Sequence, residues 1–127
     1  MKTLGATVVA VLCALVLLPA VALAHANLTS CSIKNHETFT AAKAPHSIKA
    51  GFAEELVPNK SWMAVFEGEA DHGLVNEKTR SVVNFRNPKQ MTLKLPKLRT
   101  GPYYLMWYTV SAIDGHRAAG VVYFTVK

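Results

Sequence analysis

The sequence predicts an all-β domain, an immunoglobulin-like sandwich of seven strands, behind an N-terminal export segment. After residue 24 the chain reads as short runs of β-branched, aromatic or alternating apolar residues, bounded by turn residues. No segment of that part sustains a helical apolar period; residues 36–45 come closest, and this stretch is short and interrupted. Prolines stand at the boundaries of the runs, where they remove no hydrogen bond from a strand ladder. These are Pro58, Pro88, Pro96 and Pro102.

Residues 1–24 have the composition of a secretory signal peptide. Lys2 is their only charged residue, an apolar stretch follows it, and the segment ends in Ala-Leu-Ala, an A-x-A type of cleavage site. A retained membrane anchor is the alternative, because the apolar stretch is long. Pro19 near its end and the small residues before His25 favour cleavage, so we expect an exported mature chain that begins at His25.

The mature chain from His25 to Lys127 has 103 residues, enough for one domain with a modest core. We count seven strands along it, the number expected of an immunoglobulin-like sandwich. In order they cover residues 26–33, 48–52, 61–68, 80–85, 91–96, 103–110 and 120–126. The first is weak, and the last two are the strongest because aromatic and β-branched residues fill them. No repeat or low-complexity linker divides residues 25–127, which we therefore expect to form a single domain.

The mature chain is basic, with 13 Lys or Arg against 8 Asp or Glu, a formal charge of +5. The basic residues are spread from Lys34 to Lys127 without a dense block, and aromatic residues do not interleave with them as in an RNA-binding motif. This pattern argues against nucleic acid as a partner. It indicates a chain that is soluble once processed, with acidic molecules as transient partners.

Cys31 is the only cysteine that remains after cleavage, so no disulfide can form within the mature chain. In an oxidising exported compartment such a thiol is either buried or available to another molecule. We expect it to act as a small buried hydrophobic residue near the first strand. The alternative, a soft metal ligand, lacks a partner at a recognisable spacing.

The last two expected strands are joined by a loop that contains Asp114, Gly115 and His116. Glycine tolerates positive φ, so the chain can curl there and turn the carboxylate and the imidazole toward one point. Asp-Gly is also a common turn dipeptide, so this pattern alone is a weak signal of a site.

His25 makes the loop more informative, because a histidine at a free N-terminus offers both its α-amine and its ring Nδ1 to one metal ion. The unperturbed pKa of an α-amine is about 8, so it loses its proton far more readily than an internal amide does. Together with Asp114 and His116, His25 would supply three nitrogens and one carboxylate oxygen. Such a tetragonal set suits Cu(II) better than Zn(II), which prefers tetrahedral ligation. The sequence therefore predicts a Cu(II) site that depends on cleavage.

The tail GPYYLMWYTVSAIDGHRAAGVVYFTV resembles the C-terminal signature of the CopC family of exported copper-resistance proteins. The shared features are a G-x-Y-x-x-x-W strand, a Val-Ser turn, the Asp-Gly-His loop and a closing strand that ends in Phe-Thr-Val. A mature chain that begins with His is the family's other mark. The resemblance implies a seven-stranded Greek-key sandwich with Cu(II) ligands at His25, Asp114 and His116.

The same resemblance implies a role without catalysis. It points to a periplasmic protein that binds copper for homeostasis or resistance, by buffering it, carrying it or delivering it. The implied partner for delivery is a CopD-type inner-membrane copper transporter.

The chain departs from the family pattern at three places, and its middle resembles the family only loosely. Many members begin His-x-His, whereas Asn27 stands at the third mature position and removes one possible imidazole. The turn of Ser-x-Pro type that usually follows is replaced by SCSIKNHETF. Some members carry a methionine-rich Cu(I) site, but the methionines here stand singly on expected strands, so we expect core residues and no Cu(I) site. They are Met63, Met91 and Met106.

The remaining histidines are weaker candidates. His36 and His46 lie in polar sequence that contains lysines, and we expect both to be solvated. His72 follows an acidic stretch that could hold a metal weakly or supply an outer ligand, but it is more simply part of a solvated hairpin connection. Trp107 and Tyr108 alternate faces on one strand, and Trp107 is expected to pack between the sheets in a structural role.

Two functions from other classes remain open at this point. An N-terminal histidine with a second histidine is also the ligand pattern of histidine-brace copper oxygenases. Those enzymes usually add an axial aromatic residue and a flat substrate face, for which this chain has little room, and an Asp ligand would discourage redox cycling. The other alternative is a metal-free immunoglobulin-like interaction module, in which residues 114–116 are no more than a turn.

Overall fold

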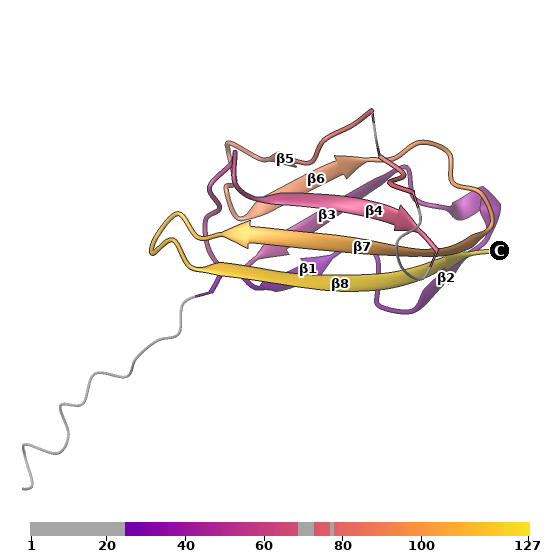
Figure 1. Ribbon diagram of the computed structural model, residues 1–127, viewed down its shortest axis with the longest axis horizontal. Coiled ribbons are helices and arrows are strands. Elements are labelled where there is room, and N and C mark those ends of the chain that lie inside the picture. Colours follow the sequence, from indigo (N-terminus) through magenta and orange to yellow (C-terminus); the bar gives the residue numbers. More distant parts are fainter. Residues whose placement is uncertain (1–24, 69–72, 77) are drawn as a thin grey trace, which may run out of the picture.

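Two four-stranded sheets pack face to face in the computed structural model, which describes residues 25–68, 73–76 and 78–127 (Figure 1). The strands are β1 (Leu28–Cys31), β2 (Glu37–Phe39), β3 (Ser47–Phe52), β4 (Trp62–Glu67), β5 (Val82–Val83), β6 (Gln90–Lys94), β7 (Gly101–Val110) and β8 (Arg117–Val126). One short 3₁₀ turn, η1 (Ala41–Lys43), is the helical element of the described residues. The predicted all-β sandwich is confirmed.

The first sheet has the strand order β1-β3-β6-β5, and the second has the order β2-β8-β7-β4. Most strands that follow one another along the chain lie in different sheets. Within the described ranges, β5–β6 and β7–β8 are the sequence neighbours that also pair by hydrogen bonds. Crossings between two packed sheets of this kind are typical of Greek-key sandwiches.

The described residues form eight strands rather than the seven expected from the sequence. The additional strand, β2, pairs in parallel with the end of β8, with Glu37 opposite Phe124 and Phe39 opposite Val126. A three-residue strand is too short for a period-two pattern to be recognised. Residues 36–45, the nearest approach to a helical pattern, hold both β2 and η1. The predicted strand count is therefore wrong, although the fold class is right.

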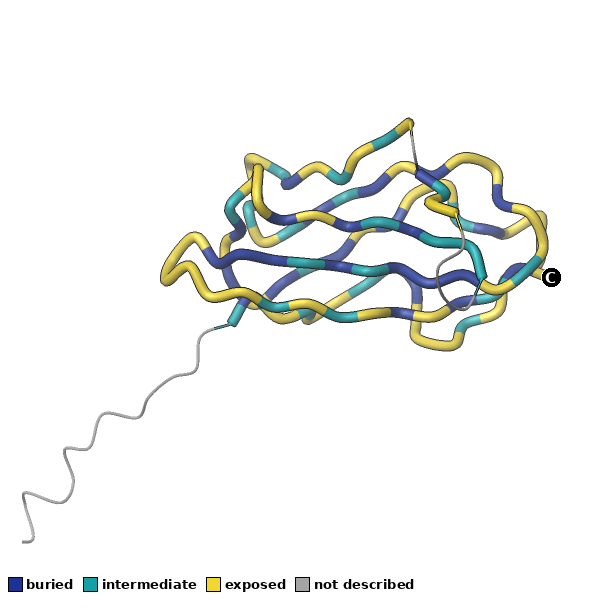
Figure 2. Tube along the Cα trace, viewed as in Figure 1, coloured by how far each residue is buried: buried dark blue, intermediate teal, exposed yellow. Residues whose placement is uncertain are grey.

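The longest strands, β7 and β8, form an antiparallel hairpin of ten residue pairs. Its pairing runs from Gly101 opposite Val126 to Val110 opposite Arg117. Both strands begin earlier than the sequence predicted. In β8, residues 117–119 have weak β propensity of their own and are drawn into the ladder by pairing with β7. The hairpin carries its loop, residues 111–116, to one end of the molecule, where it is largely exposed (Figures 1 and 2).

The core lies between the two sheets and is built from alternate positions along the strands. Trp107 on β7 is only 7% exposed and meets Phe52 of β3, with ring centroids 5.6 Å apart and planes at 62°. Gly120 on β8 lies against the same indole, since a Cβ there would be 2.5 Å from Cζ2 of Trp107. The expected packing of Trp107 between the sheets is confirmed.

The sulfur-containing side chains divide between the core and its border. Met63 and Met91 are buried, as expected, whereas Met106 is half-buried and faces outward from the second sheet. Cys31, at the end of β1, is half-buried and packs against the core, and this burial raises the pKa of its thiol. The thiol thus lies at the border of the core rather than inside it.

Two predicted features fall on residues that the structure does not describe. The expected signal peptide, residues 1–24, and His72 both lie outside the described residues. Among the described residues, no helix is long and apolar enough to cross a membrane.

Candidate metal site

His25 stands at one end of the sandwich, where the residues that follow it are held by both sheets. Ala26 is fully buried, and its carbonyl oxygen accepts a 2.7 Å hydrogen bond from the hydroxyl of Thr109 on β7. The carbonyl oxygen of Asn27 accepts a 2.9 Å hydrogen bond from the amide of Ala53, just after β3. These bonds fix the backbone beside His25 from two directions.

The 111–116 loop is closed by its own backbone. The Ser111 amide donates to the His116 carbonyl oxygen and the Gly115 amide donates to the Ser111 carbonyl oxygen, both at 2.9 Å. Gly115 has a φ of +73°, which glycine adopts at little cost and other residues rarely adopt. The curl that the sequence predicted at this glycine is therefore present.

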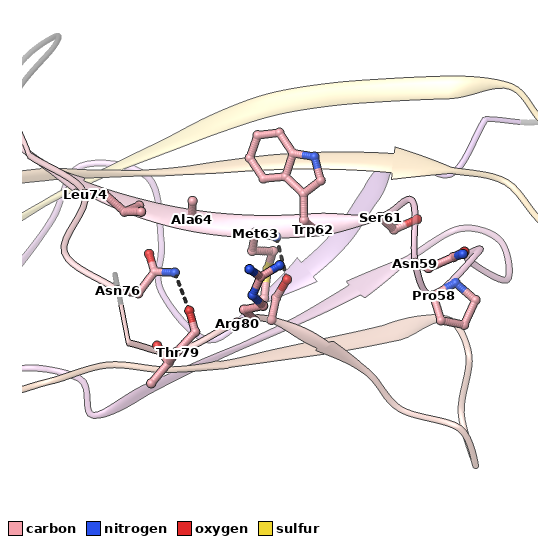
Figure 3. Close-up of a pocket in the computed structure, with 11 residues that line it drawn as sticks. Pro58, Asn59, Ser61, Trp62, Met63, Ala64, Leu74, Asn76, Thr79 and Arg80 are labelled. Atoms are coloured by element: carbon pink, nitrogen blue, oxygen red, sulfur yellow. Dashed lines mark hydrogen bonds between the residues drawn. The ribbon is translucent and has the colours of Figure 1, made fainter.

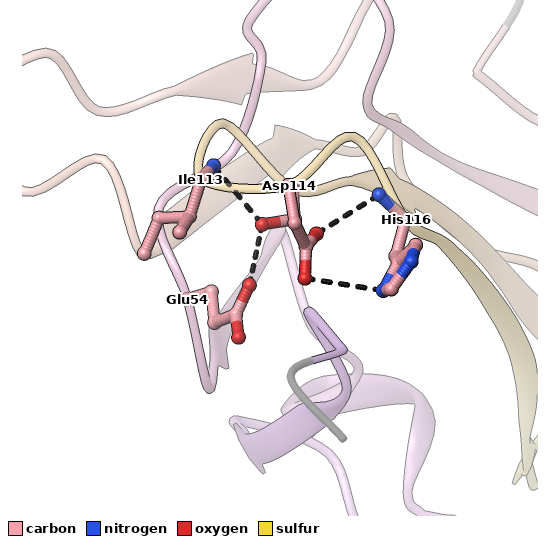
Figure 4. Close-up of polar contacts among 5 residues, drawn as sticks. Glu54, Ile113, Asp114 and His116 are labelled. Carbon is pink, nitrogen blue, oxygen red and sulfur yellow. Dashed lines mark hydrogen bonds and ion pairs between the residues drawn. The ribbon is translucent and has the colours of Figure 1, made fainter. Parts of the chain in front are cut away.

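Asp114 holds His116 at two points (Figure 4). Its Oδ1 accepts a 3.0 Å hydrogen bond from the His116 amide, and its Oδ2 lies 3.1 Å from Nδ1 of the His116 ring. The hydrogen bond from the His116 amide holds the pKa of Asp114 below its ordinary value, against an opposing loss of solvation, and interactions with the His116 ring, the Ser111 hydroxyl and His25 add to the lowering. The carboxylate therefore stays ionised at neutral pH, as an anionic metal ligand must.

Glu54 braces the loop through a side-chain hydrogen bond to its first residue, Ser111 (Figure 4). The Ser111 hydroxyl donates a short hydrogen bond to Oε2 of Glu54 and accepts one of 3.1 Å from the Ile113 amide. Both residues are buried, Glu54 with 9% and Ser111 with 1% of its surface exposed. A buried carboxylate that is bonded to the loop fixes the loop's backbone relative to the segment after β3.

Glu54 was not among the residues singled out from the sequence. Its partner Ser111 lies 57 positions further along the chain, and no local pattern connects the two. The signal that could have found it is a carboxylate placed directly after the apolar end of an expected strand, where a charged side chain needs a bonding partner.

The ring of His25 meets the loop at its edge. Its centroid lies 5.2 Å from that of the His116 ring, and the two planes are at 67°. Nδ1 of His25 is buried and has no hydrogen-bond partner among the residues that the structure describes. A buried polar atom without a partner costs about 1–3 kcal/mol. Since this nitrogen and the α-amine of a processed chain would form one chelate ring, the donors present fit Cu(II).

The three predicted ligands, His25, Asp114 and His116, thus lie at the same end of the sandwich. Across residues 25–68, 73–76 and 78–127, however, no three His, Cys, Asp or Glu side chains are arranged closely enough to hold a metal ion as they stand. Within the loop, Oδ2 of Asp114 and Nδ1 of His116 lie 3.1 Å apart. Binding by all three residues therefore requires their side chains to rearrange around the ion.

The other histidines that the structure describes are exposed, as expected. His36 has a φ of +63° and stacks on Tyr123, with ring centroids 5.7 Å apart. His46 is exposed, and its carbonyl oxygen accepts a hydrogen bond from the Leu95 amide. Both side chains are exposed, whereas Nδ1 of His25 is buried.

Comparison with known proteins gives consistent matches. A family model of the CopC domain matches residues 28–127, a range that contains the 111–116 loop and begins just after His25. The crystal structure of CopC from Methylosinus trichosporium OB3b is 25% identical, with a TM-score of 0.70, over 81% of this chain and 94% of that chain. PcoC, a methionine-rich copper resistance protein from Escherichia coli, is 28% identical, with a TM-score of 0.66, over 82% of this chain and 100% of that chain. A search of curated proteins found no match.

Proposed function

Because this chain belongs to the CopC family, we propose that it binds Cu(II) where His25 meets the 111–116 loop. The proposed ligands are the α-amine and Nδ1 of His25, the carboxylate of Asp114 and the ring of His116. The proposed role is to bind copper and hand it on for homeostasis or resistance, without catalysis.

The observation that carries the proposal is the buried, unpartnered Nδ1 of His25 beside the His116 ring. Cleavage before His25 would place a free amine on the same residue, and amine and ring would then close a chelate. Three nitrogens and one carboxylate oxygen make a donor set that favours Cu(II). Asn27 is exposed and offers no imidazole, so His25 and His116 would be the two imidazoles of the site.

Assembly of the site requires one local change in the loop. The metal ion would replace the proton between Oδ2 of Asp114 and Nδ1 of His116, while Oδ1 can keep its bond to the His116 amide. The bond between Glu54 and Ser111 would hold the backbone of the loop during this change. The protein's contribution is thus a fixed loop that presents a carboxylate and an imidazole side by side.

Release of copper would proceed by ligand exchange. His25 would be the terminal residue of the processed chain, so its amine and ring could leave the metal without moving a strand, and this would open the site to an acceptor. We propose that this exchange takes place in the periplasm and that a CopD-type inner-membrane transporter is one acceptor.

Copper titration tests the N-terminal chelate directly. We expect Cu(II) to bind the processed protein more than about 100-fold more tightly than a form that retains Met ahead of His25. Loss of a residue that only hydrogen-bonds to a metal ligand typically costs 10- to 100-fold in affinity, and the extended form would lose a ligand itself. His116→Ala should weaken binding as well, whereas His46→Ala, at an exposed histidine, should bind as the unchanged protein does. Equal affinity of the processed and Met-extended forms would contradict the chelate.

A further inference from the structure

A shallow groove opens on the outer side of the second sheet, beside the 111–116 loop, which is called the metal loop below. It has a volume of about 480 Å³, and its walls come from β4 and the turn before it, from β7, and from the loop and the start of β8. The residues that matter for its chemistry are Lys60, Trp62, Tyr108, Gly115 and Arg117. Gly115 stands between the two loop ligands in sequence, so a molecule in the groove would lie against the metal loop.

Trp62 and Tyr108 form an aromatic surface in this groove. They lie opposite each other in the pairing of β4 with β7, and their rings stack with centroids 5.8 Å apart and planes at 19°. The stack does not bury the indole, since Trp62 remains 40% exposed. Trp and Tyr at the centre of a contact surface are the residues that most often anchor a protein partner.

Trp62 also borders a second groove of about 520 Å³ on the neighbouring surface (Figure 3). Asn76 and Thr79 line this groove and are joined by a 3.1 Å hydrogen bond, and Arg80 lies beside them. The indole therefore lines both grooves. Arg80, which lines the second groove only, adds an exposed cation there.

The groove beside the loop is cationic. Lys60 and Arg117 are both exposed, and within the described part of the chain no ion pair joins either of them to a carboxylate. None of the residues that line this groove is acidic. Two nearby carboxylates are already bonded, Asp114 to His116 and Glu54 to Ser111. Glu55, whose carbonyl oxygen accepts a hydrogen bond from the Ala112 amide, is exposed but does not line the groove. Unpaired cations around an apolar surface are complementary to an acidic segment that carries an apolar side chain.

We propose that this groove docks an acidic segment of the protein that exchanges copper with the site. One apolar side chain of that segment would pack on Trp62 and Tyr108, and carboxylates on either side of it would pair with Lys60 and Arg117. The identity of the cargo rests on the function proposed above, whereas docking itself needs no metal.

A second copy of this chain fits the groove less well. A stable interface needs about 800 Å² from each partner, which exceeds what one groove of this size can supply. The chain is also basic, so two copies would repel each other. A small, charged contact is suited to the brief encounter that transfer of a metal ion requires.

Titration of a defined peptide into processed, copper-free, ¹⁵N-labelled protein tests the proposal. The probe is an end-capped peptide with the sequence Asp-Glu-Phe-Asp-Glu. We expect it to shift the NMR signals of the Trp62 indole and of the amides of Tyr108, Gly115 and Arg117. A peptide with Ala in place of Phe, and one with Lys in place of each acidic residue, should bind at least about tenfold more weakly.

Substitutions in the protein provide the matched controls. Trp62→Ala and Lys60→Gln should each weaken binding of the acidic peptide several-fold, whereas Lys49→Gln should leave it unchanged because Lys49 is exposed on β3 of the other sheet. Signals that shift over the whole basic surface, or an equal response to the Lys-substituted peptide, would overturn the proposal. So would tighter binding of phosphatidylglycerol vesicles through the same residues, or concentration-dependent self-association that Trp62→Ala abolishes.

Copper titration of the same proteins separates this proposal from the proposed function. If the Lys60→Gln variant binds the acidic peptide more weakly but binds copper as the unchanged protein does, the groove is a docking surface distinct from the metal ligands. If the processed protein binds the acidic peptide but no copper, the proposed function is contradicted and the docking proposal stands. If it binds copper but not the peptide, the docking proposal fails alone.

Discussion

The two sheets differ in length and in the surface that they present to solvent. β7 and β8 of the second sheet are ten residues long, whereas the described strands of the first sheet have at most six. The outer face of the first sheet has no aromatic pair; Lys49 lies opposite Thr92, and the exposed Val82 lies on the other side of Thr92. The outer face of the second sheet is aromatic, with Trp62 opposite Tyr108.

This difference indicates a division of roles. The long β7–β8 hairpin carries the 111–116 loop past the end of the core, and the aromatic surface lies directly beside that loop. The first sheet covers the other side of the core and, through Glu54 after β3, braces the loop. The second sheet therefore carries both surfaces to which we assign a function, and the segment after β3 of the first sheet supports the loop.

Loss of the core shared by the two sheets should have the largest effect on stability. Trp107→Ala removes the indole that meets Phe52 across the core and should lower the free energy of unfolding by about 3–5 kcal/mol. That is a large part of the stability of a small domain. Urea unfolding followed by far-ultraviolet circular dichroism measures it. Trp62→Ala is the matched control on the exposed face, and a loss as large as that of Trp107→Ala would remove the distinction between core and surface aromatics.

Removal of the brace should have the next largest effect. Glu54→Ala leaves the buried Ser111 hydroxyl without its acceptor and should cost about 1–3 kcal/mol of unfolding free energy. Copper binding should weaken at the same time, because the loop loses its fixed backbone. Glu55→Ala, at the exposed neighbouring carboxylate, should change neither quantity. If Glu54→Ala destabilises the fold but binds copper normally, the first sheet does not position the loop.

A smaller effect is expected at acid pH. The pKa of Asp114 is lower in the folded chain than its unfolded value of about 3.9, so its charged form stabilises the fold above that pH. This contribution is lost as the pH falls through the folded pKa, and it is small because the side chain is accessible to solvent. Asp114→Asn keeps an oxygen that can accept the hydrogen bond from the His116 amide, but its side chain does not ionise. The unfolding free energy of this variant should therefore lack this part of its dependence on pH. Urea midpoints from about pH 5 to about pH 2 measure it, and an unchanged dependence would contradict the assignment.

The smallest expected effect lies in the first sheet, at Cys31. Loss of solvation raises the pKa of this thiol above its ordinary value, so the folded chain holds less thiolate at a given pH than the unfolded chain does. The fold should accordingly lose a little stability as the pH rises past the ordinary thiol pKa. Iodoacetamide should modify Cys31 more slowly in the folded protein than in urea at the same pH. Equal rates would show that the thiol is open to solvent.

The fold class and the candidate ligands could be predicted because each rests on a local pattern. Asp114 and His116 stand two residues apart around a glycine, and His25 is marked by the end of the apolar leader. The strand β2 could not be predicted, because three residues are held there by parallel pairing with β8, far along the chain. The bond of Glu54 to Ser111 was missed for the same reason, since it depends on how distant segments meet.

The aromatic stack in the docking groove could be predicted only in part. Alternation along β7 predicts that Trp107 and Tyr108 face opposite ways, and the structure agrees, with Trp107 buried and Tyr108 paired on the outer face. The stacking of Trp62 on Tyr108 depends on the register between β4 and β7, which no local pattern specifies.

The most direct measurement is the electron paramagnetic resonance spectrum of Cu(II)-loaded protein that has been purified after export and shown by its intact mass to begin at His25. We expect the spectrum to show three nitrogen donors, from the His25 amine, the His25 ring and the His116 ring, and two in His116→Ala. A spectrum that is unchanged when Met is retained ahead of His25 would contradict a copper site built on the mature N-terminus.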